Sequence, residues 1–205
     1  MSHKPALIIG LGYKAGVGKS TVAQQLRERH KFAEFALADA LKDTVAPLFN
    51  WDREDLDDQD FKKTIDKDWG ITPRQALQTL GTDCVRKAFG DDFWIKRLQL
   101  VIREQKCRLV VITDVRFRNE AESIKAKGGV LWQIKRPLTD AAAGAHISET
   151  EMDSFDDWDE VINNDGSLEL LYGRIEVALA NAMLKKLETK LAADKATLKK
   201  LETPK

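Results

Sequence analysis

A glycine-rich segment near the start of the chain, GYKAGVGKST at residues 12–21, carries the residue types that bind nucleotide phosphates. In such a loop the backbone N–H groups converge on the phosphates, a lysine reaches the β and γ phosphates, and the following hydroxyl holds Mg²⁺. We therefore expect this phosphate-binding loop to hold ATP and Mg²⁺, with Lys19 in catalysis and Ser20 as a metal ligand. The residues expected to contact ATP here are Lys14, Ala15, Gly16, Val17, Gly18, Lys19, Ser20 and Thr21.

The spacing of this loop departs from the usual pattern at one position. The first glycine is expected five residues before Gly18, where this chain has Tyr13, and Gly12 lies one residue further back. Either the loop is one residue longer than usual, or Tyr13 adopts the conformation that a glycine normally takes.

Polar side chains recur every four residues in a second segment, at Arg74, Gln78, Thr82 and Arg86. On a helix this spacing places them along one slowly rotating flank. Two arginines on that flank could clamp an acceptor phosphate, and an ordinary solvated helix face is the alternative. The apolar stripe of the same helix is expected at Ala76, Leu77, Leu80, Cys84 and Ala88.

Two aspartates stand where predicted strands end, at the sheet edge where open α/β folds bind ligands. Asp39 could orient the attacking phosphate oxygen or help to bind the metal, and capping the next helix is its alternative role. Asp114 follows the apolar run at 109–112 and could hold the water shell of Mg²⁺, while Arg116 could reach phosphate. A structural turn pairing is the alternative for both.

The stretch between Arg136 and Trp158 has no clear periodicity and contains AAAG followed by HISE. Its length and small residues suit a mobile lid that closes over the phosphates and excludes water, with Arg136 at the hinge. His146 is expected to contact substrate or lid, or to be a structural histidine. Neither His3 nor His30, the other histidines, lies in a metal-ligand cluster.

The elements that must position these residues follow the order of an α/β fold. The apolar run at 5–11, ended by glycines, predicts a strand buried on both faces of a parallel sheet. Thr72 and Pro73 open a helix, and Asn119 with Glu122 forms a capping-box-like pair that opens another. Strands are expected at 5–11, 32–37, 109–112, 130–134 and 161–162, and helices at 20–30, 41–49, 73–88, 92–105, 119–127 and from 167 onward.

Composition narrows the class of protein. A chain of 205 residues with 43% apolar residues can form one domain with a substantial core. Because 33 basic residues balance 33 acidic ones, no global basic field is available to hold nucleic acid. No signal pattern or bilayer-length apolar run is visible, so we expect no membrane partner and a cytoplasmic location. Cys84 and Cys107 are expected to be reduced, buried thiols, and the acidic segment 51–70 to be a surface excursion without chemistry.

Six segments taken together resemble the deoxynucleoside monophosphate kinases of bacteriophages, in the same order and at similar spacing. The match runs from about residue 7 to 179, and TPRQALQTLGT and DVRFRNEAE are more specific than the loop. Many phage members carry aspartate where this chain has Ser20. Dephospho-coenzyme A kinases share a weaker version and are the nearest alternative. The segments are GYKAGVGKST, ADALKDTV, TPRQALQTLGTDCVR, DVRFRNEAESIKAKGG, HISETE and INNDGSLELL.

The resemblance implies an α/β fold of the P-loop NMP-kinase type, a parallel sheet flanked by helices. A kinase domain at 1–182 would contain an acceptor-binding helical region at about 50–105 and a lid at about 136–158. The implied reaction transfers the γ-phosphoryl group of ATP to a dNMP, in the host cytoplasm if the protein is phage-encoded. The second alternative is a P-loop switch or assembly protein without an acceptor.

The resemblance also implies roles for individual residues. Lys19, Asp39 and Arg136 would be catalytic, and the turn at 163–166 would contact the ATP base through Asn163, Asp165 and Gly166. The expected metal ligands are Ser20 and Asp114. The expected substrate-binding residues are Asp39, Lys42, Arg74, Gln78, Arg86, Arg116, His146 and Glu149.

The C-terminal tail at 183–205 repeats the sequence KKLET fourteen residues apart. Its leucines fit coiled-coil a and d positions, but Asp194 interrupts the seam. A solvated helical extension and a weak homodimer contact both remain open. The leucines concerned are Leu184, Leu187, Leu191, Leu198 and Leu201.

Overall fold

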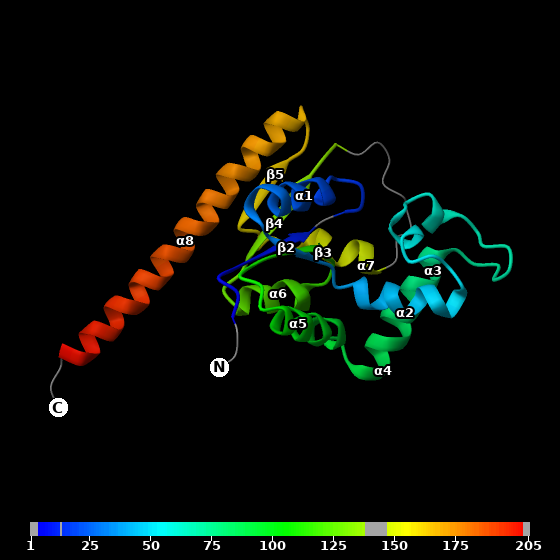
Figure 1. Ribbon diagram of the computed structural model, residues 1–205, viewed down its shortest axis with the longest axis horizontal. Helices are drawn as coiled ribbons and strands as arrows, with labels where there is room; N and C mark the ends of the chain where they lie inside the picture. Colours follow the sequence, from blue (N-terminus) through cyan, green and yellow to red (C-terminus); the bar gives the residue numbers. More distant parts are fainter. Residues whose placement is uncertain (1–3, 13, 138–146, 203–205) are drawn as a thin grey trace.

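A five-stranded parallel sheet forms the centre of the protein (Figure 1). The computed structural model describes residues 4–12, 14–137 and 147–202, without the side chains of residues 148, 149 and 198–202. The strand order is β2-β3-β1-β4-β5, and each neighbouring pair is parallel, which confirms the predicted α/β class. The strands are β1 (Leu7–Gly12), β2 (Ala33–Phe35), β3 (Leu109–Val115), β4 (Val130–Lys135) and β5 (Glu160–Asn163).

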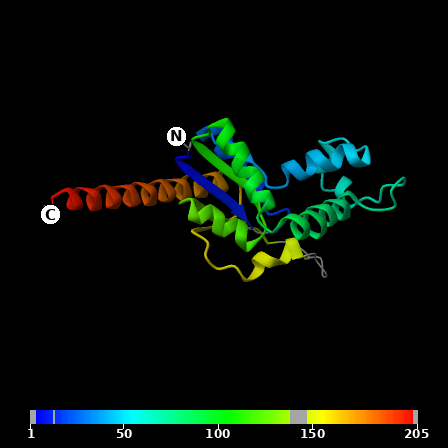
Figure 2. The same cartoon turned by 90° about the horizontal axis from the view of Figure 1, so that it is seen from below.

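Helices cover both faces of the sheet and extend beyond one end of it (Figures 1 and 2). One face packs against α1 and α8 and the other against α5 and α6, while α2, α3 and η1 enclose a third apolar cluster beside the sheet. The long helices are α1 (Lys19–His30), α2 (Asp39–Phe49), α5 (Phe93–Gln105), α6 (Arg118–Ala126) and α8 (Leu168–Glu202); the short ones are η1 (Asp55–Asp57), η2 (Phe61–Lys63), α3 (Pro73–Gln78), η3 (Thr79–Arg86), α4 (Lys87–Phe89), α7 (Ile147–Thr150) and η4 (Glu151–Ser154).

Helix α8 packs on the body only over its first half and then runs away from it (Figure 1). Leu171, Ile175 and Ala182 are buried, whereas Leu184 and Leu187, further along, are more than half exposed. The helix is continuous across residue 183, where the tail was expected to begin. Within the described part of the chain, no helix combines the length and the apolar character needed to cross a membrane.

The helix predicted at 73–88 departs from α geometry. It begins as expected, because Thr72 caps it and Pro73 occupies its first turn, but residues 79–86 form a π-helix. Hydrogen bonds from each residue to the fifth along rotate the later positions relative to the α pattern. Cys84 is therefore exposed rather than buried, and the expected stripe does not continue through it. Cys107 is a half-buried free thiol, so the burial predicted for both cysteines is wrong.

The π-helix turns Gly81 and Arg86, five residues apart, toward the interior. A Cβ atom on Gly81 would lie 2.5 Å from a methyl group of Leu41, so the glycine permits close approach of α2. The indole of Trp94 donates to the Gly81 carbonyl at 2.9 Å. The π-helix therefore packs closely against α2, through Gly81 and Leu41, and against α5, through Trp94.

Arg86 forms a buried ion pair with Glu120, at 3.4 Å, and its guanidinium lies over the Phe117 ring. One carboxylate oxygen of Glu120 accepts the backbone N–H groups of Arg116 (2.8 Å) and Phe117 (3.0 Å) and so caps α6. The predicted capping pair of Asn119 and Glu122 is wrong, because the helix begins two residues earlier than that pair requires. Burial raises the pKa of Glu120 to about 7.

We predict that Arg86→Ala destabilises the protein by about 3–5 kcal/mol, because it leaves a buried carboxylate unpaired. The folded pKa of Glu120 lies above its unfolded value, so this group's contribution to stability declines as pH rises between them. Without Arg86 the folded pKa of Glu120 rises further, so the decline in stability extends to higher pH. The loss of stability caused by Arg86→Ala is therefore larger at pH 8 than at pH 5.

Urea denaturation at the two pH values measures this loss. The matched control is Arg27→Ala, which removes an exposed pair with Glu34 and should cost about 0–1 kcal/mol. Equal losses for both variants would contradict the structural role of Arg86, and Arg86→Ala combined with Glu120→Gln should recover part of the loss.

Candidate active site at the carboxyl edge of the sheet

The phosphate-binding loop leaves the central strand β1 and leads directly into α1. Gly16 and Gly18 have φ angles of 78° and 101°, a left-handed region that strains residues with a Cβ atom. Val17 between them is fully buried and anchors the loop. Lys19 is the first residue of α1, and its ammonium donates to the Lys14 carbonyl at 2.5 Å.

The remaining loop residues surround this anchor. Ala15 and Ser20 are exposed and Thr21 is half-buried. The Lys14 ammonium lies 3.3 Å from the carboxylate of Asp153 in η4, which ties the loop to the second half of the segment predicted to form the lid. Tyr13 lies outside the described residues, so the two readings of the loop length remain predictions.

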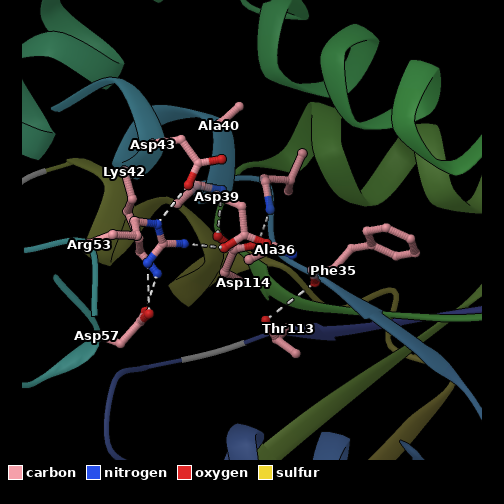
Figure 3. Close-up of polar contacts among 12 residues, drawn as sticks. Phe35, Ala36, Asp39, Ala40, Lys42, Asp43, Arg53, Asp57, Thr113 and Asp114 are labelled. Atoms are coloured by element: carbon pink, nitrogen blue, oxygen red, sulfur yellow. Dashed lines mark hydrogen bonds and ion pairs between the residues drawn. The ribbon is translucent and has the colours of Figure 1, made fainter. Parts of the chain in front are cut away.

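A second polar group lies at the start of α2, where Asp39 follows β2 (Figure 3). One oxygen of Asp39 accepts the Ala36 N–H at 2.9 Å, and the other lies 3.0 Å from the guanidinium of Arg53. The same guanidinium contacts Asp43 at 2.7 Å and Asp57 at 2.8 Å. Arg53 therefore joins three carboxylates. Burial lowers the pKa of Arg53, but the hydrogen bonds that its guanidinium donates to Asp43 and Asp57 raise that pKa above its ordinary value.

The segment 51–70 was expected to be a surface excursion without chemistry, and in the structure it supplies part of this network. Besides Arg53, it supplies Asp57, which also accepts a hydrogen bond from the Lys42 ammonium at 2.5 Å. Burial pushes the pKa of Asp57 up, but the bonds from Lys42 and Arg53 hold it below its ordinary value. Scattered charges without periodicity offer no sequence signal for such a network.

Lys62 of η2 marks a concentration of positive charge beside this network. Burial, followed by the nearby charges of Lys42, Arg74 and Arg116, lowers the pKa of Lys62 to about 8, although Asp57 partly offsets them. Burial is the largest cause of this shift, and the neighbouring like charges add to it. We call Lys42, Lys62, Arg74 and Arg116 the cationic cluster; the sequence indicated all of its members except Lys62.

Asp114 lies inside β3, near the carboxyl edge, and braces the turn before α2 (Figure 3). Its two oxygens accept the N–H groups of Leu37 at 2.6 Å and Ala38 at 2.9 Å. This is the turn pairing named as an alternative. Each oxygen keeps a further lone pair, so with the exposed Ser20 hydroxyl the donor set still fits a hydrated Mg²⁺. Among the described side chains, no three His, Cys, Asp or Glu gather as a metal cluster.

Other predicted site residues are dispersed. Arg86, expected to bind the acceptor, is in the buried pair with Glu120, whereas Gln78 is half-buried at the end of α3. Arg136 is exposed and follows β4, the neighbour of β1, at the edge where the loop opens. His146 and the rest of 138–146 lie outside the described residues, as does the Glu149 side chain.

The turn after β5 contacts the phosphate-binding loop. The side-chain amide of Asn164, a residue not singled out from the sequence, donates to the Val17 carbonyl at 2.9 Å. Arg174 holds the turn from α8 by donating to the Asn163 carbonyl and to the Asp165 carboxylate. The residues predicted to contact the base, Asn163, Asp165 and Gly166, are all exposed.

Comparison with known proteins shows which family the chain belongs to. The family model for deoxynucleotide monophosphate kinase matches residues 54–175. A relative in Acanthamoeba polyphaga mimivirus, whose name also refers to this kinase, is 36% identical over 190 residues, covering 86% of this chain and 97% of the relative. Deoxynucleotide monophosphate kinases of Escherichia phage RB69 and Enterobacteria phage T4 are 35% and 29% identical over 56% and 58% of this chain. The chain spans about half of their length, 47% and 49%.

Two solved kinase structures overlap more loosely. Shikimate kinase from Bacteroides thetaiotaomicron is 12% identical with a TM-score of 0.44, covering 89% of this chain and 98% of that one. Dephospho-CoA kinase from Campylobacter jejuni is 12% identical with a TM-score of 0.43, covering 85% and 96%. At these values the overlap carries no inference about function.

We predict that Asp114→Asn destabilises the ligand-free protein by about 1–3 kcal/mol, because the new amide N–H₂ faces a backbone N–H. Urea denaturation without metal measures the effect, with the exposed Asp156→Asn as control. A carboxylate that served only a metal would leave the metal-free stability unchanged or improved by this substitution.

Proposed function

The chain belongs to the deoxynucleotide monophosphate kinase family, and from that premise we propose that it transfers the γ-phosphoryl group of ATP to a deoxynucleoside monophosphate, giving a dNDP and ADP. The family assignment agrees with the resemblance read from the sequence. What supports the proposal is that the glycine-rich loop, which follows β1, and Arg116 of the cationic cluster, which follows β3, lie at the same carboxyl edge of the parallel sheet.

On the donor side, the loop would hold the ATP phosphates. Lys19 would exchange the Lys14 carbonyl for the β and γ phosphates, a short movement because its ammonium already lies over the loop. Mg²⁺, when bound, would neutralise phosphate charge; Ser20 would hold it and Asp114 would accept from its water shell. The turn at 163–166 would contact the base.

On the acceptor side, the cationic cluster would bind the phosphate of the dNMP. A phosphate dianion beside Lys62 would offset the burial and the neighbouring like charges that lower the lysine's pKa. Asp39 would stay close to the acceptor without repelling it strongly, because its charge is paired with Arg53. Gln78, at the end of α3, lies in the same helical region and would also contact the acceptor. Arg86, which is held in its buried ion pair, would support the acceptor site only by stabilising the fold.

Transfer would depend on position and charge more than on covalent chemistry. Arg136, at the end of β4, would stabilise the charge of the moving phosphoryl group. The proposal thus includes ATP and Mg²⁺ as cofactors, a small-molecule acceptor and a cytoplasmic location. The exposed leucines of α8 leave the homodimer as a further, separate possibility for the tail.

A panel of acceptors tests this function: ADP release is measured with each dNMP, each NMP and dephospho-coenzyme A. We predict turnover that depends on a dNMP. Lys19→Ala should lower it by roughly 10² or more, and Arg136→Ala should lower kcat more than about tenfold with KM little changed. Turnover with dephospho-coenzyme A alone, or slow hydrolysis that no acceptor stimulates, would establish one of the alternatives instead.

Lys62 provides a test that does not depend on catalysis. Above pH 8 its amine is mostly neutral in the free protein, and a bound phosphate dianion favours the ammonium, so dNMP binding at pH 8.5 should take up a proton. Calorimetric titration in two buffers of different ionisation enthalpy measures this uptake. Lys62→Met should abolish it, while Lys63→Met, a change at the exposed neighbour, should not. Equal uptake in all three proteins would remove Lys62 from the acceptor site.

A further inference from the structure

We propose that Asn164 is a positioning residue that sets the direction of the Gly18 N–H in the phosphate-binding loop. The inference rests on the proposed function, since it concerns how the loop receives ATP phosphates. Its first basis is the hydrogen bond from the Asn164 side-chain amide to the Val17 carbonyl, at 2.9 Å. The backbone N–H of Asn164 donates to the Lys135 carbonyl at 2.6 Å, so the residue is itself anchored to the end of β4.

The geometry of the peptide bond converts this contact into an orientation. The described chain contains no cis peptide bonds, so the unit between Val17 and Gly18 is trans and planar. In a trans unit the C=O and the following N–H point in opposite directions. Because Asn164 holds the Val17 carbonyl, the Gly18 N–H points away from Asn164. A donor directed in this way is what an anionic phosphate requires of the loop.

The same peptide would otherwise be free to turn over. Gly18 has no Cβ atom and adopts φ of 101°, and glycine passes between positive and negative φ at little steric cost. In the reversed orientation the Val17 carbonyl oxygen would face the phosphates and repel them. The loop therefore needs an outside group to select one orientation, and Asn164 is placed to do so.

Close packing limits the freedom of this contact. A Cβ atom on Gly18 would lie 2.3 Å from the amide nitrogen of Asn164, so the amide occupies the space beside the glycine. On the other side, the fully buried Val17 side chain fixes the start of the peptide unit. The turn that carries Asn164 is held in turn by Arg174, through the Asn163 carbonyl and Asp165.

This arrangement makes a prediction that separates phosphate binding from base binding. Binding of ADP and of adenosine is measured by calorimetry for the wild type, Asn164→Ala and a control, Asn181→Ala. The control removes another side-chain amide of the same region, which donates to Glu160 at 2.8 Å. Asn164→Ala should weaken ADP binding by about 10-fold to 100-fold and adenosine binding by less than about twofold, because only ADP uses the Gly18 N–H. Asn181→Ala should change neither.

Each other outcome is decisive. Equal losses for ADP and adenosine would make Asn164 a support of the base-binding turn alone, and unchanged ADP binding would also overturn the proposal. If the wild type binds no ADP, the proposed function fails, which the wild-type titration reveals before any variant. Should Asn164→Ala unfold, as thermal denaturation would show, Asn164→Leu keeps a similar shape without the donor and should give the same ADP-selective loss.

Discussion

The parallel pairing of β1 with both β3 and β4 is the constraint on which the site depends. Every residue of β1 is buried, and its backbone groups are paired by strands on both sides. Because all five strands share one direction, each of their carboxyl ends reaches the same edge. The loop leaves the middle strand, with Asp39 and Arg116 following the strands on one side and Arg136 and Asn164 following those on the other. In the proposed function, this order would place the acceptor residues and the donor residues on opposite sides of the loop.

Charge compensation around Arg53 and Asp57 limits the free-energy cost of bringing so many ionised groups together. Asp57 accepts from Lys42 and Arg53 together, and Arg53 also satisfies Asp39 and Asp43. These pairs are partly exposed, so each contributes little to stability by itself. Their effect is to fix the place of Lys42 and of the segment that carries Lys62. In the proposed function, a bound phosphate would offset the burial and the like charges that lower the pKa of Lys62.

How far the sequence predicted these features depends on whether their cause is local. Apolar runs and glycine spacing predicted the strands and the loop, because both patterns follow from neighbouring residues. The α-helical period did not predict the π-helix at 79–86. That helix packs through Gly81 against Leu41, a tertiary contact that no local pattern contains. Arg53 lies in a segment without periodicity, and the contact of Asn164 with Val17 joins residues far apart in the chain. No local pattern could have indicated either of these contacts.

The buried Arg86–Glu120 pair links the π-helix η3 to the start of α6, two elements that the sheet alone does not connect. Arg86 ends the π-helix that continues from α3, where Arg74 lies. Glu120 accepts the N–H of Arg116, and so holds the backbone of a second member of the cationic cluster. A buried pair tolerates little change in its geometry, because separation would leave a carboxylate in an apolar environment. The π-helix, by turning Arg86 inward, thus connects the helix that carries Arg74 to the backbone of the β3–α6 turn that carries Arg116.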